Sequence, residues 1–83
     1  MEMNDMFEDL DVFATVVEQS SLNKASKLLN LSQPALSRKI TKLEDELGVQ
    51  LFNRRGKRLE LTAFGQSAYT FALEQRQQQQ KFM

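Results

Sequence analysis

Two helical segments separated by only three residues constrain the fold of this chain more than any other feature. Apolar residues recur with helical spacing over residues 22–29 and again over 33–47. Between them, Asn30 can take the left-handed conformation that ends a helix, and Ser32 can cap the next one. Two helices joined this closely, each with an apolar face, are typical of a helix-turn-helix, which we predict at about residues 22–41.

The second of these helices carries its own start and stop signals. Leu31 and Leu36 stand at the N′ and N4 positions around Ser32, where they can form a hydrophobic staple. Pro34 falls in the first turn, where no intrahelical N–H bond is lost. Gly48 can end the helix in the left-handed conformation, so the predicted helix spans about 33–47.

A further helix is predicted before this pair, over about residues 4–19, with its acids on the outer face and in the first turns. Ser21 can cap the helix that follows it. The residues expected to face the core are Met6, Leu10, Phe13 and Val17 in the first helix, Ala25, Leu28 and Leu29 in the second, and Leu36, Ile40, Leu43 and Leu47 in the third.

The hydrophobic period changes after Gly48. Two short β-like runs flank the letters RRGK, which predicts a small hairpin, or wing, at about residues 49–61. Thr62 can cap a last helix over 63–83. An apolar strip on that helix can either complete the core or form a dimer face, and the residues leave both alternatives open. The strip consists of Phe64, Ala68, Phe71 and Ala72.

Composition excludes several classes of function. The chain has 83 residues with neither cysteine nor histidine, so it is one small domain without disulfides, thiolate ligands or the usual general base. We therefore expect no enzymatic activity and no metal or other cofactor. The acidic N-terminal segment and the absence of a long apolar run favour the cytoplasm and argue against a membrane protein.

The charge is unevenly distributed although its sum is zero. Residues 2–18 contain six acids and no base, whereas residues 24–58 contain nine bases and three acids. A domain with one basic face is expected to bind phosphates, and double-stranded DNA is the partner that this pattern favours.

The outward face of the 33–47 helix supplies side chains that can read base pairs. Glutamine can bond adenine, arginine can bond guanine, serine can bond either, and a proline ring can pack on a thymine methyl group. The candidates for base contacts are Gln33, Pro34, Ser37, Arg38 and Thr41. Glu44–Glu46 follow later, where the helix is expected to leave the major groove.

Phosphate contacts are expected around this face. Their candidates are Asn23, Lys24, Ser32, Lys42 and Arg54, and the wing tip adds Arg55, Lys57 and Arg58 as candidates for the minor groove or the backbone. Two of these residues have a second interpretation. Ser32 serves more readily as a cap than as a contact, and Arg54 can instead pair with Glu44 and hold the wing.

These residues resemble the DNA-binding domain of LysR-type transcriptional regulators. The matching motifs are SQPALS at residues 32–37, the I-x-x-L-E-x-x-L-G spacing from Ile40 to Gly48, LF-x-R from Leu51 to Arg54, and LT-x-x-G from Leu61 to Gly65. The similarity covers nearly the whole chain. It implies a mainly α fold, with a winged helix-turn-helix of three core helices and a two-stranded wing at 5–62, followed by a linker and dimerisation helix at 63–83.

The resemblance also implies a function. It points to sequence-specific binding of an inverted repeat by a homodimer, for transcription regulation in the bacterial cytoplasm. By position it assigns base readout to Gln33, Pro34, Ser37 and Arg38, phosphate contacts to Asn23, Lys24 and Lys42, and the minor groove to the wing tip. Ser26, Lys57 and Phe64 depart from the residues usual in the family. Full members continue into an effector-binding domain, so no small-molecule site is expected in these residues. The alternative is a winged-helix module that binds protein and not DNA.

Overall fold

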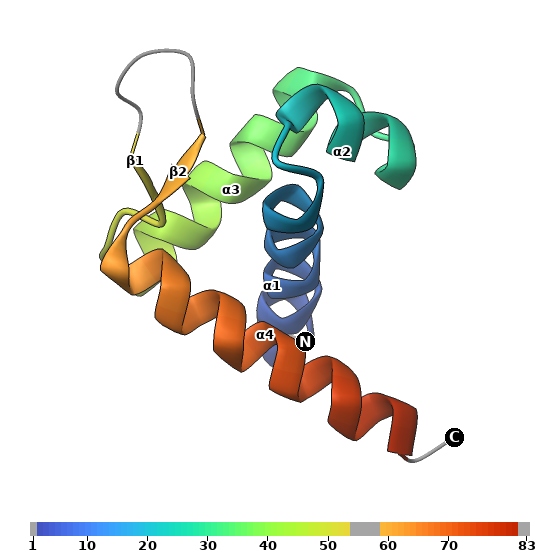
Figure 1. Ribbon diagram of the computed structural model, residues 1–83, viewed down its shortest axis with the longest axis vertical. Helices are drawn as coiled ribbons and strands as arrows, with labels where there is room; N and C mark the ends of the chain where they lie inside the picture. The colour runs from blue at the N-terminus through green and yellow to red at the C-terminus, as the bar shows by residue number, and fades with distance from the viewer. Residues whose placement is uncertain (1, 54–58, 82–83) are drawn as a thin grey trace.

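The computed structural model describes residues 2–53 and 59–81, and these residues form a mainly helical winged helix-turn-helix (Figure 1). The elements follow in the order α1 (Glu2–Gln19), α2 (Leu22–Leu29), α3 (Gln33–Leu47), β1 (Phe52–Asn53), β2 (Glu60–Leu61) and α4 (Ala63–Lys81). None of the described helices combines the length and the apolar character needed to cross a bilayer.

The helix-turn-helix begins and ends at the predicted capping residues. The Oγ of Ser21 accepts a hydrogen bond from the Lys24 nitrogen at 3.1 Å, and the Oγ of Ser32 accepts one from the Ala35 nitrogen at 3.2 Å. Asn30 ends α2 in the left-handed conformation, with φ 58° and ψ 45°. These local signals fix the short connection and so the angle at which α3 follows α2.

The core lies where α1, α2 and α3 meet. Its largest fully buried side chains are Phe13, Leu36, Ile40, Leu43, Leu51 and Val16. Phe13 on α1 also packs edge-to-face on Phe52 of the wing, with ring centroids 5.3 Å apart. The wing is thereby anchored to the same core that supports α3.

Two expected core residues are exposed. Leu28 on α2 is 66% exposed, and Leu47 at the end of α3 is also exposed, so both predictions of burial were wrong. The helix α2 has only eight residues, and it buries Ala25 and Ser26 while Leu28 stays outside the contact with the core. Leu47 occupies the last turn of α3.

The wing pairs antiparallel, with Phe52 opposite Leu61 and Asn53 opposite Glu60. Its base is joined to α4 at Thr62, whose backbone nitrogen donates to the Leu51 carbonyl at 3.0 Å. The Thr62 hydroxyl accepts from the Gly65 nitrogen at 3.0 Å and so caps α4. A Cβ at Gly65 would overlap the Leu51 carbonyl oxygen, so this position requires glycine.

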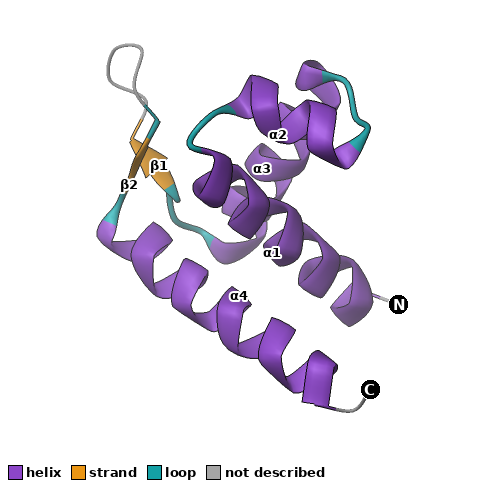
Figure 2. Cartoon of the chain, turned by 45° about the vertical axis from the view of Figure 1, so that its right-hand side comes forward, coloured by secondary structure: helices purple, strands orange, loops and turns teal. Residues whose placement is uncertain are grey.

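The last helix, α4, packs along α1 and not on α2, as Figures 1 and 2 both show. Its apolar strip divides into two parts. Ala72 is buried and Ala68 packs partly against the core, whereas Phe64 is 61% and Phe71 43% exposed. The alanines therefore complete the core, and the two phenylalanines remain on the surface of the single chain.

Candidate nucleic-acid interface

The outward face of α3 presents most of the side chains predicted to contact bases. Gln33, Pro34, Arg38 and Thr41 are exposed, and Ser37 is half-buried at the edge of that face. All five lie on α3, whose opposite side carries buried Leu36, Ile40 and Leu43. The apolar side fixes the helix against the core, and the polar side remains available to a partner.

The predicted phosphate contacts on α2 are also accessible. Asn23 and Lys24 are exposed in the first turn of α2. The Lys24 backbone N–H is engaged by the Ser21 cap, so its ammonium group, and not that N–H, is the group available to an anion. Ser32 is exposed, and its hydroxyl caps α3.

One acid of α1 is not on the outer face as the helical pattern predicted. The Asp9 side chain is only 4% exposed, and its two oxygens face two lysines of α3. Lys39 Nζ lies 3.8 Å from Oδ1, and Lys42 Nζ lies 3.4 Å from Oδ2. A carboxylate is stable at such a buried position because it is paired. Lys42, a predicted phosphate contact, is therefore also part of the contact between α1 and α3.

A second acid, Glu44, is buried although we expected it where α3 leaves the groove. Its Oε2 accepts hydrogen bonds from the backbone nitrogens of Leu51, at 2.8 Å, and Phe52, at 3.3 Å. These two residues lead directly into the wing. Glu44 thus fixes the base of the wing to the recognition helix. The sequence indicated that Glu44 can hold the wing by pairing with Arg54, but not that it accepts these backbone hydrogen bonds.

The wing-tip predictions fall outside the described residues. Arg54, Arg55, Lys57 and Arg58 all lie between Asn53 and Leu59, where the description stops and resumes. Their proposed contacts with phosphates, the minor groove or Glu44 remain predictions.

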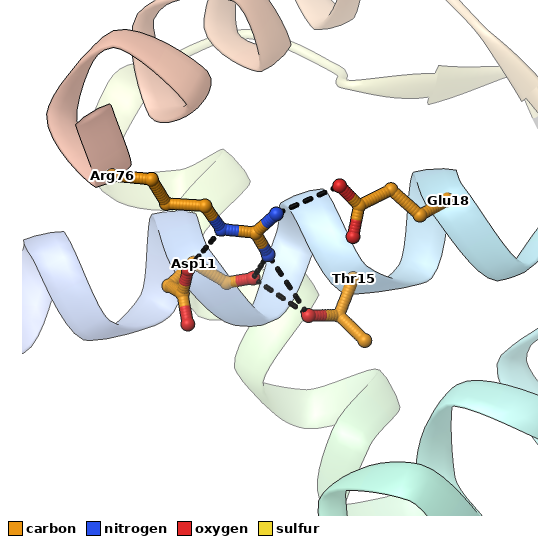
Figure 3. A network of polar contacts seen from close by, with 4 residues as sticks. All are labelled: Asp11, Thr15, Glu18 and Arg76. Carbon is orange, nitrogen blue, oxygen red and sulfur yellow. Dashed lines mark hydrogen bonds and ion pairs between the residues drawn. The ribbon is translucent and has the colours of Figure 1, made fainter. Parts of the chain in front are cut away.

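A polar network between α4 and α1 was not predicted from the sequence (Figure 3). The Arg76 guanidinium lies between Asp11 and Glu18, pairing with Asp11 Oδ1 through Nε and with Glu18 Oε2 through Nη1 at 2.7 Å. Its Nη2 donates to the Thr15 hydroxyl at 3.2 Å. Burial alone would lower the pKa of Arg76, but the bonds to Asp11 and Glu18 outweigh it and raise that pKa.

The network sets the position of α4. Asp11, Thr15 and Glu18 lie three or four residues apart on one side of α1, so a single arginine can reach all three. With Ala72 buried one turn before Arg76, α4 is held along α1 by both apolar and charged contacts. Phe64 and Phe71 are consequently directed to the surface.

Within the described residues, no group of three or more histidine, cysteine or acidic side chains is placed to hold a metal ion.

Comparison with known proteins places this arrangement in one family. The model of the bacterial regulatory helix-turn-helix protein, lysR family, matches residues 7–66. Among curated relatives, the transcriptional regulators YeiE and YbhD of Escherichia coli (strain K12), both described as uncharacterised, are similar. YeiE is 46% identical over 71 residues, and the match covers 86% of this chain and 24% of the YeiE chain. YbhD is 44% identical over 63 residues, and the match covers 76% of this chain and 20% of the YbhD chain.

Solved structures agree in fold. The DNA-binding domain of BenM, a regulator from Acinetobacter baylyi, crystallised with benA site 1 DNA, superposes with a TM-score of 0.86 at 36% identity. The superposition covers 92% of this chain and 85% of that one. This chain spans about a fifth to a quarter of the length of the curated relatives named above. The chain belongs to the LysR family of bacterial regulatory helix-turn-helix proteins.

Proposed function

We propose that this chain binds double-stranded DNA sequence-specifically as a homodimer and serves transcription regulation. The observation that carries the proposal is the outward face of α3, where exposed Arg38 and Thr41 follow the exposed N-terminal residues Gln33 and Pro34. A recognition helix uses this end and this face in the major groove. The similar BenM domain was crystallised with DNA, which supports the same use here.

The proposed contacts form two groups: contacts with base edges, which read the DNA sequence, and contacts with phosphates, which position the protein on the duplex. Base contacts are assigned to Gln33, Pro34, Ser37, Arg38 and Thr41, and phosphate contacts to Asn23, Lys24, Ser32, Lys42 and Arg54. Arg55, Lys57 and Arg58 are assigned to the minor groove or backbone. We assign these roles to residues 5–62 and dimerisation to residues 63–83.

The dimer proposal concerns the part of α4 that the core does not use. Phe64 and Phe71 are separated by seven residues, so they lie near one another on one side of α4. Large apolar side chains that remain exposed together favour association. A second copy of the chain can cover both, because a two-fold interface brings the same residues from each protomer together.

Sedimentation of the purified chain tests the dimer. We expect Phe64→Gln with Phe71→Gln to weaken dimerisation by at least about tenfold, since each phenylalanine loses its apolar partner surface. Leu28→Gln is the matched control, because Leu28 is also a large exposed apolar residue but lies on α2. Unchanged association of the double variant would place the interface elsewhere.

DNA binding itself is tested by titrating a labelled random-sequence duplex at several salt concentrations. The proposal predicts an affinity that falls steeply with salt, because phosphate contacts release counterions. No binding at any salt concentration would contradict it and favour a winged-helix module for protein partners. As part of the same proposal, we assign the chain to the bacterial cytoplasm, without enzymatic activity and without a small-molecule effector site in these residues.

A further inference from the structure

A buried acid of α1 pairs with two lysines of α3, and one of them, Lys42, is a proposed phosphate contact. Asp9 on α1 is 4% exposed and pairs with Lys39 and Lys42 on α3 at 3.8 and 3.4 Å. We refer to these three residues as the Asp9 cluster. Both lysines lie on α3, the proposed recognition helix. A carboxylate of α1 therefore offsets positive charge on the helix that is proposed to enter the major groove.

The lysines of the Asp9 cluster are anchored but remain accessible. Lys39 and Lys42 are three residues apart and are therefore neighbours on the surface of α3. Their side chains are 43% and 54% exposed. Lys42 also follows Arg38 by one helical turn, so it borders the base-reading face. An ammonium group in this position can contact a phosphate while it stays paired with the carboxylate.

We infer that Asp9 sets the overall affinity of the domain for DNA without touching the DNA. The carboxylate of Asp9 offsets part of the positive charge that Lys39 and Lys42 give to α3. Attraction to phosphates is independent of sequence and dominates non-specific binding. Asp9 thus weakens binding to every duplex by a similar factor while leaving the base contacts of α3 intact. The inference rests on the proposed DNA binding.

A purely structural role for Asp9 would have an effect of opposite sign. If the carboxylate served only to hold α3 on α1, its removal would loosen the recognition helix and weaken binding to all duplexes. If it offsets lysine charge, its removal strengthens binding to random-sequence DNA. The direction of the change in affinity separates the two roles.

The test compares Asp9→Asn with Glu8→Gln in titrations of a random-sequence duplex. Glu8→Gln removes the same charge from the next residue of α1, but Glu8 is exposed and has no ion pair among the described residues. We expect Asp9→Asn to bind the random duplex about three- to tenfold more tightly, with a steeper salt dependence. Glu8→Gln should change this affinity less than about twofold.

A double-mutant cycle then tests whether Asp9 acts on DNA affinity through Lys42. In a Lys42→Gln background, Asp9→Asn should give a smaller gain than in the wild type, because half of the charge that Asp9 offsets is gone. If Asp9→Asn does not fold, Lys42→Gln is compared with Lys24→Gln. The inference predicts that Lys42→Gln loses less random-duplex affinity than Lys24→Gln, because Asp9 already offsets part of the Lys42 charge. A loss for Lys42→Gln that equals or exceeds the loss for Lys24→Gln overturns the inference.

The outcomes distinguish this inference from the function on which it rests. A wild-type chain that binds no duplex contradicts the proposed DNA binding. A wild-type chain that binds normally, with a folded Asp9→Asn variant of equal or weaker random-duplex affinity, overturns the role of Asp9 alone.

Discussion

The Oε2 atom of Glu44 lies 2.8 Å from the backbone nitrogen of Leu51, so a side chain of the recognition helix holds the entrance to the wing. The same oxygen also accepts from the Phe52 nitrogen. The helix α3 and the base of the wing, which we propose to face DNA, are therefore joined by a buried carboxylate as well as by apolar packing. Their relative position is fixed before any DNA is bound.

Replacing Glu44 with alanine should destabilise the fold strongly. The change leaves two buried backbone N–H groups without this acceptor, and each such loss costs about 1–3 kcal/mol. We expect a loss of about 2–4 kcal/mol in the free energy of unfolding, measured by urea denaturation. Glu44→Gln keeps one amide oxygen and should lose less. The control, Glu46→Ala, removes an exposed acid of the same helix and should change stability by less than about 0.5 kcal/mol. Similar losses for Glu44→Ala and Glu46→Ala would show that Glu44 does not stabilise the base of the wing.

Gly65→Ala should destabilise the domain although alanine favours helices. Helix propensity alone would stabilise the variant by about 1 kcal/mol. The added Cβ would overlap the backbone oxygen of Leu51, which cannot move without displacing the wing base, so we expect a net loss of about 1–3 kcal/mol. Thermal unfolding measures the sign directly. Ser67→Ala, at an exposed position of the same helix, is the control and should be neutral or slightly stabilising; a Gly65→Ala variant as stable as this control would disprove the close approach.

Arg76→Ala should loosen α4 from α1. The arginine bridges Asp11 and Glu18 but is partly exposed, so solvent screening limits the expected loss to about 1 kcal/mol, smaller at high salt. Because its pKa is raised, the contribution is fully present below the ordinary arginine pKa and disappears only as strongly alkaline pH passes the raised value. Urea denaturation at low and high salt measures the effect, with exposed Gln77→Ala as the control. Equal losses for the two variants would show that the network contributes nothing.

Arg38→Ala should weaken binding to a preferred duplex by about 1–3 kcal/mol and relax the preference at one base pair, because arginine can form a bidentate contact with guanine. Lys24→Ala should instead weaken binding to all sequences alike and flatten the salt dependence, as expected for a phosphate contact. Competition titrations with single-base variants of the duplex separate these patterns. Unchanged sequence preference in Arg38→Ala would mean that another part of α3 reads the bases.

Local signals allowed much of the fold to be predicted. Ser21, Asn30, Ser32 and Gly48 determine helix ends through their own backbone and side-chain geometry, so α2 and α3 begin and end where the sequence indicated. The same residues specify the short turn, which is what makes the two helices a helix-turn-helix. The exposed face of α3 followed from the same helical period.

The long-range polar contacts could not be predicted in this way. Asp9 was interpreted as a surface acid because periodicity shows which positions suit apolar residues and says nothing of a charged partner elsewhere in the chain. For Glu44 the sequence indicated a pairing with Arg54 that holds the wing, but not its bonds to two backbone nitrogens at the base of the wing. Asp9 meets lysines about thirty residues away, and Arg76 meets acids about sixty residues away. Leu28 was misjudged for a related reason, since an eight-residue helix offers the core only a narrow face.

The central claim is sequence-specific binding of DNA by a dimer, and selection of bound sites from a randomised duplex pool tests it most directly. The purified 83-residue chain is incubated with the pool at moderate salt, and the retained duplexes are sequenced. We predict enrichment of an inverted repeat, in which each half-site meets one recognition helix. A pool that is retained without enrichment, or not retained at all, would contradict the account.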